Sequence, residues 1–233
     1  MWDNPRLLNG AAGFLVGITV LACVLVALHW MLRSSLFQLR VVELRTPVQH
    51  ASRASIEAVL ARPAGSNFFA AGLSELRLAL EQLPWVRRAS VRRVWPDRLE
   101  VDIEEHVAFA RWGSDALVNP YGERFTGTSN AELPLFVGPP GTEAEVARRY
   151  ERFAALLQPL GSRLERVVLS PRHAWQLRLA NGLQITLGRD AEAAEQRLQR
   201  FVDAYGRTLP AGRSGPEAVD LRYPNGFALR ARG

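Results

Sequence analysis

The chain has 233 residues and a formal net charge of +6 at pH 7, and all 29 of its basic side chains are arginine. The arginines alternate with acidic residues and form no basic stripe with interleaved aromatic residues, which is the pattern expected of a nucleic-acid-binding surface. A single cysteine, Cys23, excludes an internal disulfide framework. The composition therefore argues against a nucleic-acid-binding protein and against a disulfide-rich secreted domain.

Residues 7–32 contain no Asp, Glu, Lys or Arg. As an α-helix this stretch would be about 39 Å long, against a hydrocarbon core of about 30 Å. Three interpretations compete: a transmembrane anchor, a cleaved signal peptide, and a lipoprotein signal ending at Cys23. The apolar run continues past Cys23 and has no small-x-small cleavage site before a polar region, which favours an anchor over 11–32 behind a short head, 1–10. Arginines on both sides leave the orientation in the membrane open.

The region after the anchor has the pattern of a small α+β domain over residues 36–106. Residues 37–44 predict a strand, and Ser52 and Ser74 are predicted to cap two short amphipathic helices. Two alternating strands follow around the turn Trp95-Pro96-Asp97, with arginines on one strand opposite acidic residues on the other. The predicted order is strand, helix, helix, strand, strand.

Residues 107–233 predict a second domain, mostly antiparallel β with two helices. Asn181-Gly182 lies between two alternating apolar runs, which is a strong hairpin signal. Thr142 and Glu145 have the spacing of a capping box, and Asp190 is placed to cap the second helix. The fold class predicted for the whole chain is a single N-terminal transmembrane helix followed by two α+β domains.

The sequence contains no pattern that predicts an active site. Its four histidines have no metal-type spacing. Glu104, Glu105 and His106 are adjacent on a predicted strand, so their side chains alternate in direction and do not readily converge. We therefore predict a protein without catalytic residues, cofactor or metal. A membrane-anchored enzyme would need a site that these residues do not assemble.

The order of several short motifs resembles the FtsQ/DivIB family of bacterial cell-division proteins. Each motif alone is weak, and their collinear order over nearly the whole chain after the anchor is specific. The motifs are Leu83-Pro84-Trp85, Ser90-Val91-Arg92, Trp95-Pro96-Asp97, Ala110-Arg111-Trp112, Leu133-Pro134, Gly138-Pro139, Trp175-Gln176-Leu177, Leu187-Gly188-Arg189, Arg197-Leu198, Arg200-Phe201-Val202 and 219–223.

The resemblance implies an inner-membrane protein with a cytoplasmic N-terminus and a periplasmic body at the division septum. Residues 36–106 would be a POTRA domain, and residues 107–233 the family's β domain. The implied function is that of a non-enzymatic scaffold that binds FtsB- and FtsL-like division proteins and is required for septum formation. The runner-up interpretation is another POTRA-bearing membrane adaptor, serving protein export or envelope assembly.

The resemblance also implies a partner-binding site, at which a partner segment adds as a strand to a sheet edge. The matching positions in this chain are Arg222, Tyr223, Asn225, Gly226, Arg172 and His173. His173 stands where the family often has a second arginine, and Ala231 stands near the place of a frequent tryptophan. The residues alone favour a plain terminal hairpin, in which Val219, Leu221 and Tyr223 alternate into the core.

Overall fold

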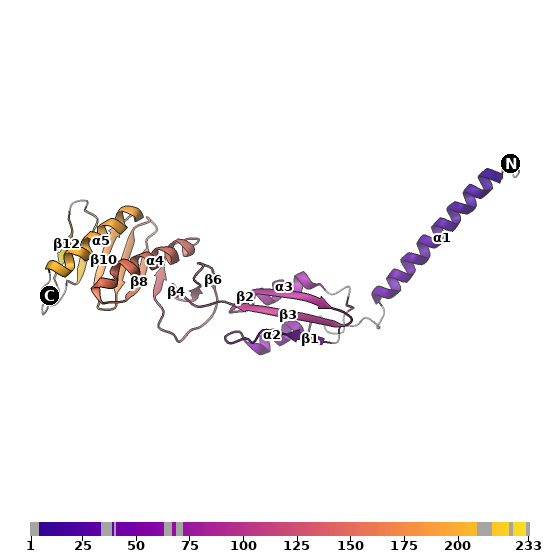
Figure 1. Cartoon of the computed structure of the whole chain (residues 1–233), viewed down its shortest axis with the longest axis horizontal. Coiled ribbons are helices and arrows are strands. Elements are labelled where there is room, and N and C mark those ends of the chain that lie inside the picture. Colours follow the sequence, from indigo (N-terminus) through magenta and orange to yellow (C-terminus); the bar gives the residue numbers. More distant parts are fainter. Residues whose placement is uncertain are drawn as a thin grey trace. The chain divides into compact units, whose positions relative to one another are not determined.

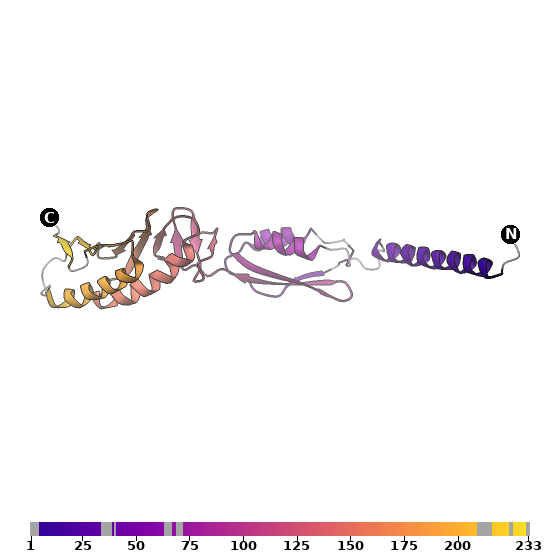
Figure 2. The same cartoon turned by 90° about the horizontal axis from the view of Figure 1, so that it is seen from above.

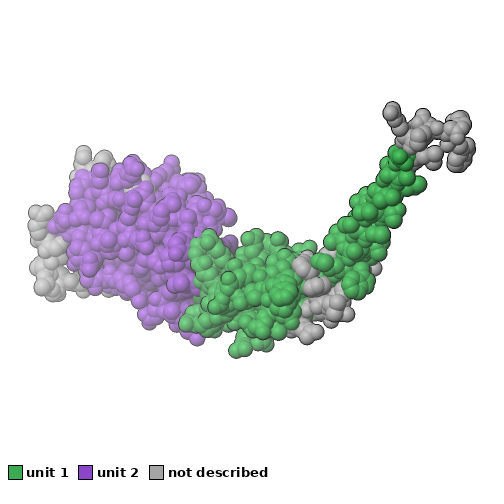
Figure 3. Space-filling model, turned by 45° about the vertical axis from the view of Figure 1, so that its right-hand side comes forward, with its two compact units in different colours: residues 1–105 green, residues 106–233 purple. Residues whose placement is uncertain are grey.

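The computed structural model describes residues 5–33, 39, 41–62, 67–68, 72–208, 216–223 and 226–231. The chain divides into two compact units, residues 1–105 and 106–233, which are coloured separately in Figure 3. Each unit has its own secondary structure.

The first element is the long helix α1, Pro5–Arg33, which confirms the predicted apolar N-terminal helix (Figure 1). Within it, 9–31 is long and apolar enough to cross a membrane. The hydroxyl of Thr19 donates to the Leu15 carbonyl at 2.9 Å, so this polar side chain is satisfied by its own helix. A helix satisfies its backbone groups internally, as a membrane interior requires.

The rest of the first unit contains a three-stranded sheet and two short helices in the predicted order. Strand β3 is central, paired in parallel with β1 and antiparallel with the long strand β2. The predicted strand over 37–44 is described only at its end, because most of 37–40 lies outside the described residues. The elements are β1 Val41–Leu44, α2 Arg53–Leu60, α3 Leu73–Glu81, β2 Val86–Val94 and β3 Arg98–Glu105.

The two helix caps predicted for this unit have different outcomes. Ser52 caps α2, and its hydroxyl accepts the Ser55 backbone N–H at 3.3 Å. The prediction for Ser74 was wrong, because α3 begins two residues earlier than such a cap requires, and Gly72 is its N-cap. The Gly72 carbonyl accepts the first helical hydrogen bond, from the Leu76 N–H at 3.0 Å. Ser74 therefore lies inside the first turn.

The hairpin of β2 and β3 has the predicted charge pairing across its outward face. Arg88 lies opposite Glu104, and Arg92 lies opposite Glu100. Arg92 forms an ion pair with Glu100, and Glu104 pairs with Arg87. The Trp95–Pro96 peptide bond in the connecting turn is cis.

The second unit is a nine-stranded sheet with two long helices on one face, as Figure 2 shows. The strand order is β12-β11-β10-β9-β8-β7-β4-β5-β6. The pairs β4–β7, β7–β8 and β10–β11 are parallel, and the other pairs are antiparallel. The elements are β4 Ala110–Trp112, β5 Ala116–Val118, β6 Arg124–Phe125, β7 Leu135–Val137, α4 Glu143–Leu157, the 3-10 turn Gln158–Leu160, β8 Leu164–Leu169, β9 Trp175–Leu179, β10 Gln184–Gly188, α5 Ala191–Thr208, β11 Ala218–Asp220 and β12 Ala228–Arg230.

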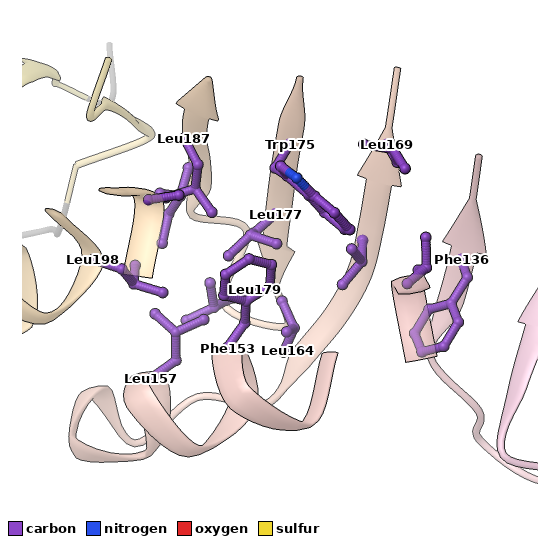
Figure 4. Packing of buried hydrophobic residues seen from close by; sticks show 14 of the residues in the cluster. Phe136, Phe153, Leu157, Leu164, Leu169, Trp175, Leu177, Leu179, Leu187 and Leu198 are labelled. Carbon is purple, nitrogen blue, oxygen red and sulfur yellow. The ribbon is translucent and has the colours of Figure 1, made fainter. Parts of the chain in front are cut away.

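The core of this unit lies between the sheet and the two helices (Figure 4). Inward residues alternate along the strands, and Trp175 at the start of β9 is 1% exposed. Its ring packs edge-on against Phe153 of α4, with 5.6 Å between centroids. An ion pair between Arg149 and Glu195 joins α4 to α5. Burial on this side leaves the opposite face of the sheet to polar side chains.

Of the two helix caps predicted for the second unit, one forms and the other does not. Asp190 caps α5, and its Oδ1 accepts the N–H groups of Glu192 and Ala193 at 3.1 and 3.0 Å. The capping box of Thr142 and Glu145 does not form. Instead, the Thr142 hydroxyl donates to the Pro139 carbonyl at 2.7 Å, which fixes the turn before α4. The hydroxyl therefore makes no capping bond to the helix N-terminus.

Candidate protein-binding edge

The last strand of the chain, β12, lies at one edge of the nine-stranded sheet and pairs with β11. Its three residues, 228–230, are all exposed. Within the described residues no strand lies on its other side. An edge strand presents unpaired backbone N–H and C=O groups and can accept a further strand. This edge is therefore a candidate surface for protein binding.

Arg222 lies two residues after the end of β11 and is held in place by Asp220. Its Nε donates to Asp220 Oδ1 at 2.9 Å, and its Nη2 donates to Oδ2 at 2.6 Å, a two-pronged pairing that fixes the guanidinium plane. Hydrogen bonding from Arg222 lowers the pKa of Asp220, and the same bonding raises the pKa of Arg222. The arginine is thus charged, oriented and exposed.

The backbone at Arg222 is also fixed by a hydrogen bond from helix α5. Arg197 of α5 donates through Nη1 to the Arg222 carbonyl at 3.3 Å and through Nη2 to the Leu187 carbonyl at 3.1 Å. Gly188 ends β10 with φ +86°, and a Cβ there would lie 3.4 Å from Cγ of Arg222. These contacts join α5 and β10 to the segment after β11.

Tyr223 is 55% exposed, so the prediction that it alternates into the core was wrong. Val219 and Leu221 are buried, but β11 ends at Asp220 and the alternation does not continue to residue 223. Beside this segment is a hollow of about 140 Å³, lined by Arg197, Arg200, Leu221, Gly226 and Phe227. Asn225, also predicted for this site, lies outside the described residues.

Arg172 and His173 lie in the loop between β8 and β9, and both are exposed. His173 has φ +56°, and its N–H donates to the Ser170 carbonyl at 2.8 Å. The loop ends at Trp175, which pairs with Gly188 across β9 and β10. Because Gly188 lies beside Arg222, the loop and the segment after β11 lie at the same end of the sheet, about two strand spacings apart.

Glu104, Glu105 and His106 have separate partners. Glu105 accepts the backbone N–H groups of residues 49–51 at 2.6–3.0 Å. His106 stacks on Phe125, with 4.1 Å between ring centroids. In the part of the chain that the structure describes, no three His, Cys, Asp or Glu side chains gather as metal ligands.

Two residues that organise this edge, Asp220 and Arg197, were missed by the sequence predictions. Asp220 carried a usable signal, because residues two apart in an extended segment lie on the same side of the chain, and an Asp-x-Arg pair can bond there. Arg197 carried none, since its partners are backbone carbonyls from two different segments.

Comparison with known proteins identifies both domains. The family model for the FtsQ-type POTRA domain matches residues 37–106, and the model "Cell division protein FtsQ/DivIB, C-terminal" matches residues 110–222. These matches confirm the predicted POTRA domain and the β domain behind it.

Several curated relatives carry the name "Cell division protein FtsQ". The relative from Burkholderia pseudomallei is 41% identical, covering 100% of this chain and 95% of that protein. The relative from Nitrosospira multiformis is 40% identical, covering 99% of each chain, and that from Bordetella pertussis is 37% identical, covering 98% of this chain and 92% of its own length. This chain therefore belongs to the FtsQ/DivIB family of cell division proteins.

Proposed function

We propose that this chain is a non-enzymatic, single-pass scaffold of the bacterial division machinery, required for septum formation. Helix α1 anchors it in the inner membrane, with its N-terminus in the cytoplasm and both domains in the periplasm at the septum. Its membership of the FtsQ/DivIB family and its one described helix suited to a membrane support this proposal.

The scaffold binds FtsB- and FtsL-like division proteins by strand addition at β12. The observation that carries this proposal is the exposed edge itself, where residues 228–230 have β11 as a neighbour on one side. In strand addition, main-chain hydrogen bonds supply affinity, and alternate side chains supply specificity.

Side chains at the same end of the sheet select the partner. Arg222, fixed by Asp220, is placed to meet a carboxylate, and the exposed ring of Tyr223 offers an apolar surface. Gly226 and Asn225 complete the segment, and Arg172 and His173 extend the site along the neighbouring loop.

The side-chain part of the proposal is tested by Tyr223→Ala in the full-length protein. Co-purification with FtsB- and FtsL-like partners from detergent-solubilised membranes should fall about tenfold or more, because a central aromatic anchor at an interface is typically worth 2 kcal/mol or more. Tyr121→Ala is the matched control, since Tyr121 is also exposed, at 68%, and belongs to the turn before β6. Unchanged recovery with Tyr223→Ala, or equal loss with both variants, would reject the assignment.

Strand addition has its own geometric test. Single cysteines at residues 228, 229 and 230, in a Cys23→Ser background, should crosslink to cysteines placed along the partner segment with a period of two residues. That period is expected because successive side chains of a strand point to opposite faces. Crosslinks without this alternation would exclude an added strand, even if the partners still co-purify.

The cellular part of the proposal predicts that depletion of the protein leaves long filaments without completed septa. Normal division after depletion would contradict it. Release of soluble fragments from purified cell wall by the protein would instead favour an enzyme.

A further inference from the structure

The face of the nine-stranded sheet opposite α4 and α5 carries three arginines in one row across the strands. Arg111 of β4 lies in register with Leu135 of β7, which lies in register with Arg166 of β8. Arg166 in turn lies opposite Arg178 of β9. Residues in register share a face of the sheet, so the three side chains project from the same side. We call Arg111, Arg166 and Arg178 the arginine row.

The arginine row has no carboxylate partner among the described residues. Other exposed arginines of the chain do have a carboxylate partner, as Arg92 has Glu100 and Arg222 has Asp220. Arg166 and Arg178 instead oppose each other directly, and like charges in that position are destabilising. An uncompensated charge pair on an ordered strand indicates a surface shaped for something other than the stability of the domain.

A bulge in β8 sets the position of Arg166. The register shifts between Leu164 and Arg166, and Glu165 is the extra residue. Leu164 and Val167 are both buried, while Glu165 and Arg166 are both exposed. The bulge therefore lets two core residues point inward while Arg166 faces Arg178, and bulges often re-aim side chains at functional sites.

Two hollows lie over the arginine row. The larger, about 540 Å³, is lined by all three arginines and by Leu133, Leu135, Gly113, Ser114 and Glu165. The smaller, about 140 Å³, shares Arg166 and Arg178 and extends over β10, where Gln184 and Thr186 line it. The larger hollow is basic, because its lining holds three arginines and one carboxylate. None of the residues lining either hollow is aromatic.

We propose that this face binds an acidic segment of another protein, in which carboxylates lie among small apolar side chains. Guanidinium groups bind carboxylates in a two-pronged geometry, and clusters of arginine recognise acidic motifs. The row extends over about 14 Å, four strands wide, which exceeds the reach of one small anion. Leucine and valine side chains between the arginines offer contacts to an apolar residue, and the lack of aromatic side chains does not suit stacking of nucleic-acid bases.

This site is separate from the β12 edge and does not rest on the function proposed for it. Tyr223 and Arg222 line neither hollow. The sheet would thus bind one partner segment through its edge and a second, acidic segment on its open face.

The test uses the full-length protein in neutral detergent micelles and a fluorescent peptide in which glutamate alternates with alanine and leucine. We expect saturable binding, seen as a rise in fluorescence anisotropy, that weakens with added salt. The double variant Arg166→Gln with Arg178→Gln should bind about tenfold or more weakly, because two charge-assisted contacts are lost. The Tyr223→Ala protein should bind normally.

The matched control is Arg148→Gln with Arg62→Gln, which removes the same charge from exposed positions on α4 and after α2. Equal loss in the control would show unspecific charge attraction and overturn the proposal, as would retained binding in the Arg166/Arg178 variant or no binding at all. A peptide with glutamine in place of glutamate should not bind. If vesicles of anionic lipid bind through Arg166 and Arg178 and the peptide does not, the face is a membrane surface and the proposal is wrong.

Discussion

The two edges of the nine-stranded sheet are built in opposite ways. At the β6 edge, Asn119 is the one buried polar residue among those described, at 1% exposure, and it ties the turn between β5 and β6 together. Its Oδ1 accepts the N–H groups of Tyr121 and Glu123 at 3.0 and 2.9 Å. Its Nδ2 donates to the Glu123 carboxylate at 2.6 Å and contacts Nδ1 of His106 at 3.1 Å. At the β12 edge, by contrast, every residue of the strand is exposed.

This difference separates an edge that is closed for stability from one that is available to a partner. The β6 edge is only two residues long, and very short edge strands are one way in which sheets avoid unwanted pairing; beside it, the buried Asn119 satisfies two backbone N–H groups of the turn. The β12 edge is bordered by side chains that are exposed and yet held in one orientation, such as Arg222, which is hydrogen-bonded to Asp220. Substitutions at the β6 edge should therefore reduce stability, and substitutions at the β12 edge should reduce binding.

The largest expected effect is that of Gly122→Ala at the closed edge. Gly122 has φ +79°, and a Cβ there would lie 2.2 Å from Cα of Ala144 at the start of α4. Strain at positive φ together with a clash against backbone should lower the free energy of unfolding by about 2–5 kcal/mol. Urea unfolding followed by tryptophan fluorescence would measure this.

The control for Gly122 is Gly113→Ala. Gly113 also has positive φ, +62°, but nothing lies within 4 Å of its added Cβ. Gly113→Ala should therefore lower the free energy of unfolding only through backbone strain at positive φ, by about 1–2 kcal/mol. Equal losses at the two glycines would show that the contact with α4 is not what fixes the closed edge.

Asn119→Ala should have the next largest effect. It leaves two backbone N–H groups of the turn without their acceptor, at a cost of about 2–3 kcal/mol in the free energy of unfolding. Asn181→Ala is the control, because Asn181 accepts one N–H, from Leu183, at an exposed hairpin turn and should cost about 1 kcal/mol. Partner recovery should be normal for both variants at temperatures where they stay folded.

The order of elements was predictable because hydrophobic periodicity decides which face of each strand or helix is buried. The pattern of β9 and β10 around Asn181-Gly182 is an example, and the structure pairs those strands as the pattern predicts. Helix starts were less predictable. Ser74 suits a cap in sequence, but Gly72 is the N-cap of α3. Thr142 is the N-cap of α4 as predicted, but its hydroxyl donates to the Pro139 carbonyl and makes no capping bond.

The candidate site was only partly predictable, because its shape depends on where β11 ends. Tyr223 fits the alternation of Val219 and Leu221, yet the strand ends before it and the ring is exposed. The arginine row was not visible in the sequence either. Arg166 and Arg178 become neighbours through strand pairing and the bulge at Glu165, and no local pattern encodes that register.

Arg178→Gln should have a smaller effect, of the opposite sign. It removes one of two like charges that face each other on β8 and β9, so the free energy of unfolding should rise by about 0.2–1 kcal/mol. Arg92→Gln is the matched control, because it breaks an ion pair with Glu100 and should lower stability by a similar amount. A loss of stability in Arg178→Gln would mean that the arginine row contributes to the fold, and its role in binding would then need another basis.

An effect as small as that of Arg178→Gln is expected for the pH dependence of stability at the β12 edge. The pKa of Asp220 is lowered by its bonds to Arg222, so the folded state favours the carboxylate. This pair stabilises the fold above the ordinary pKa of 3.8, and its contribution is lost as the pH falls through the lowered value. The difference in unfolding free energy between the unaltered protein and Asp220→Asn should therefore be about 0.2–1 kcal/mol at pH 7 and approach zero in acid. Partner recovery should also fall in Asp220→Asn, because Arg222 loses its orientation. Recovery equal to that of the unaltered protein would show that binding at the β12 edge does not depend on a fixed arginine.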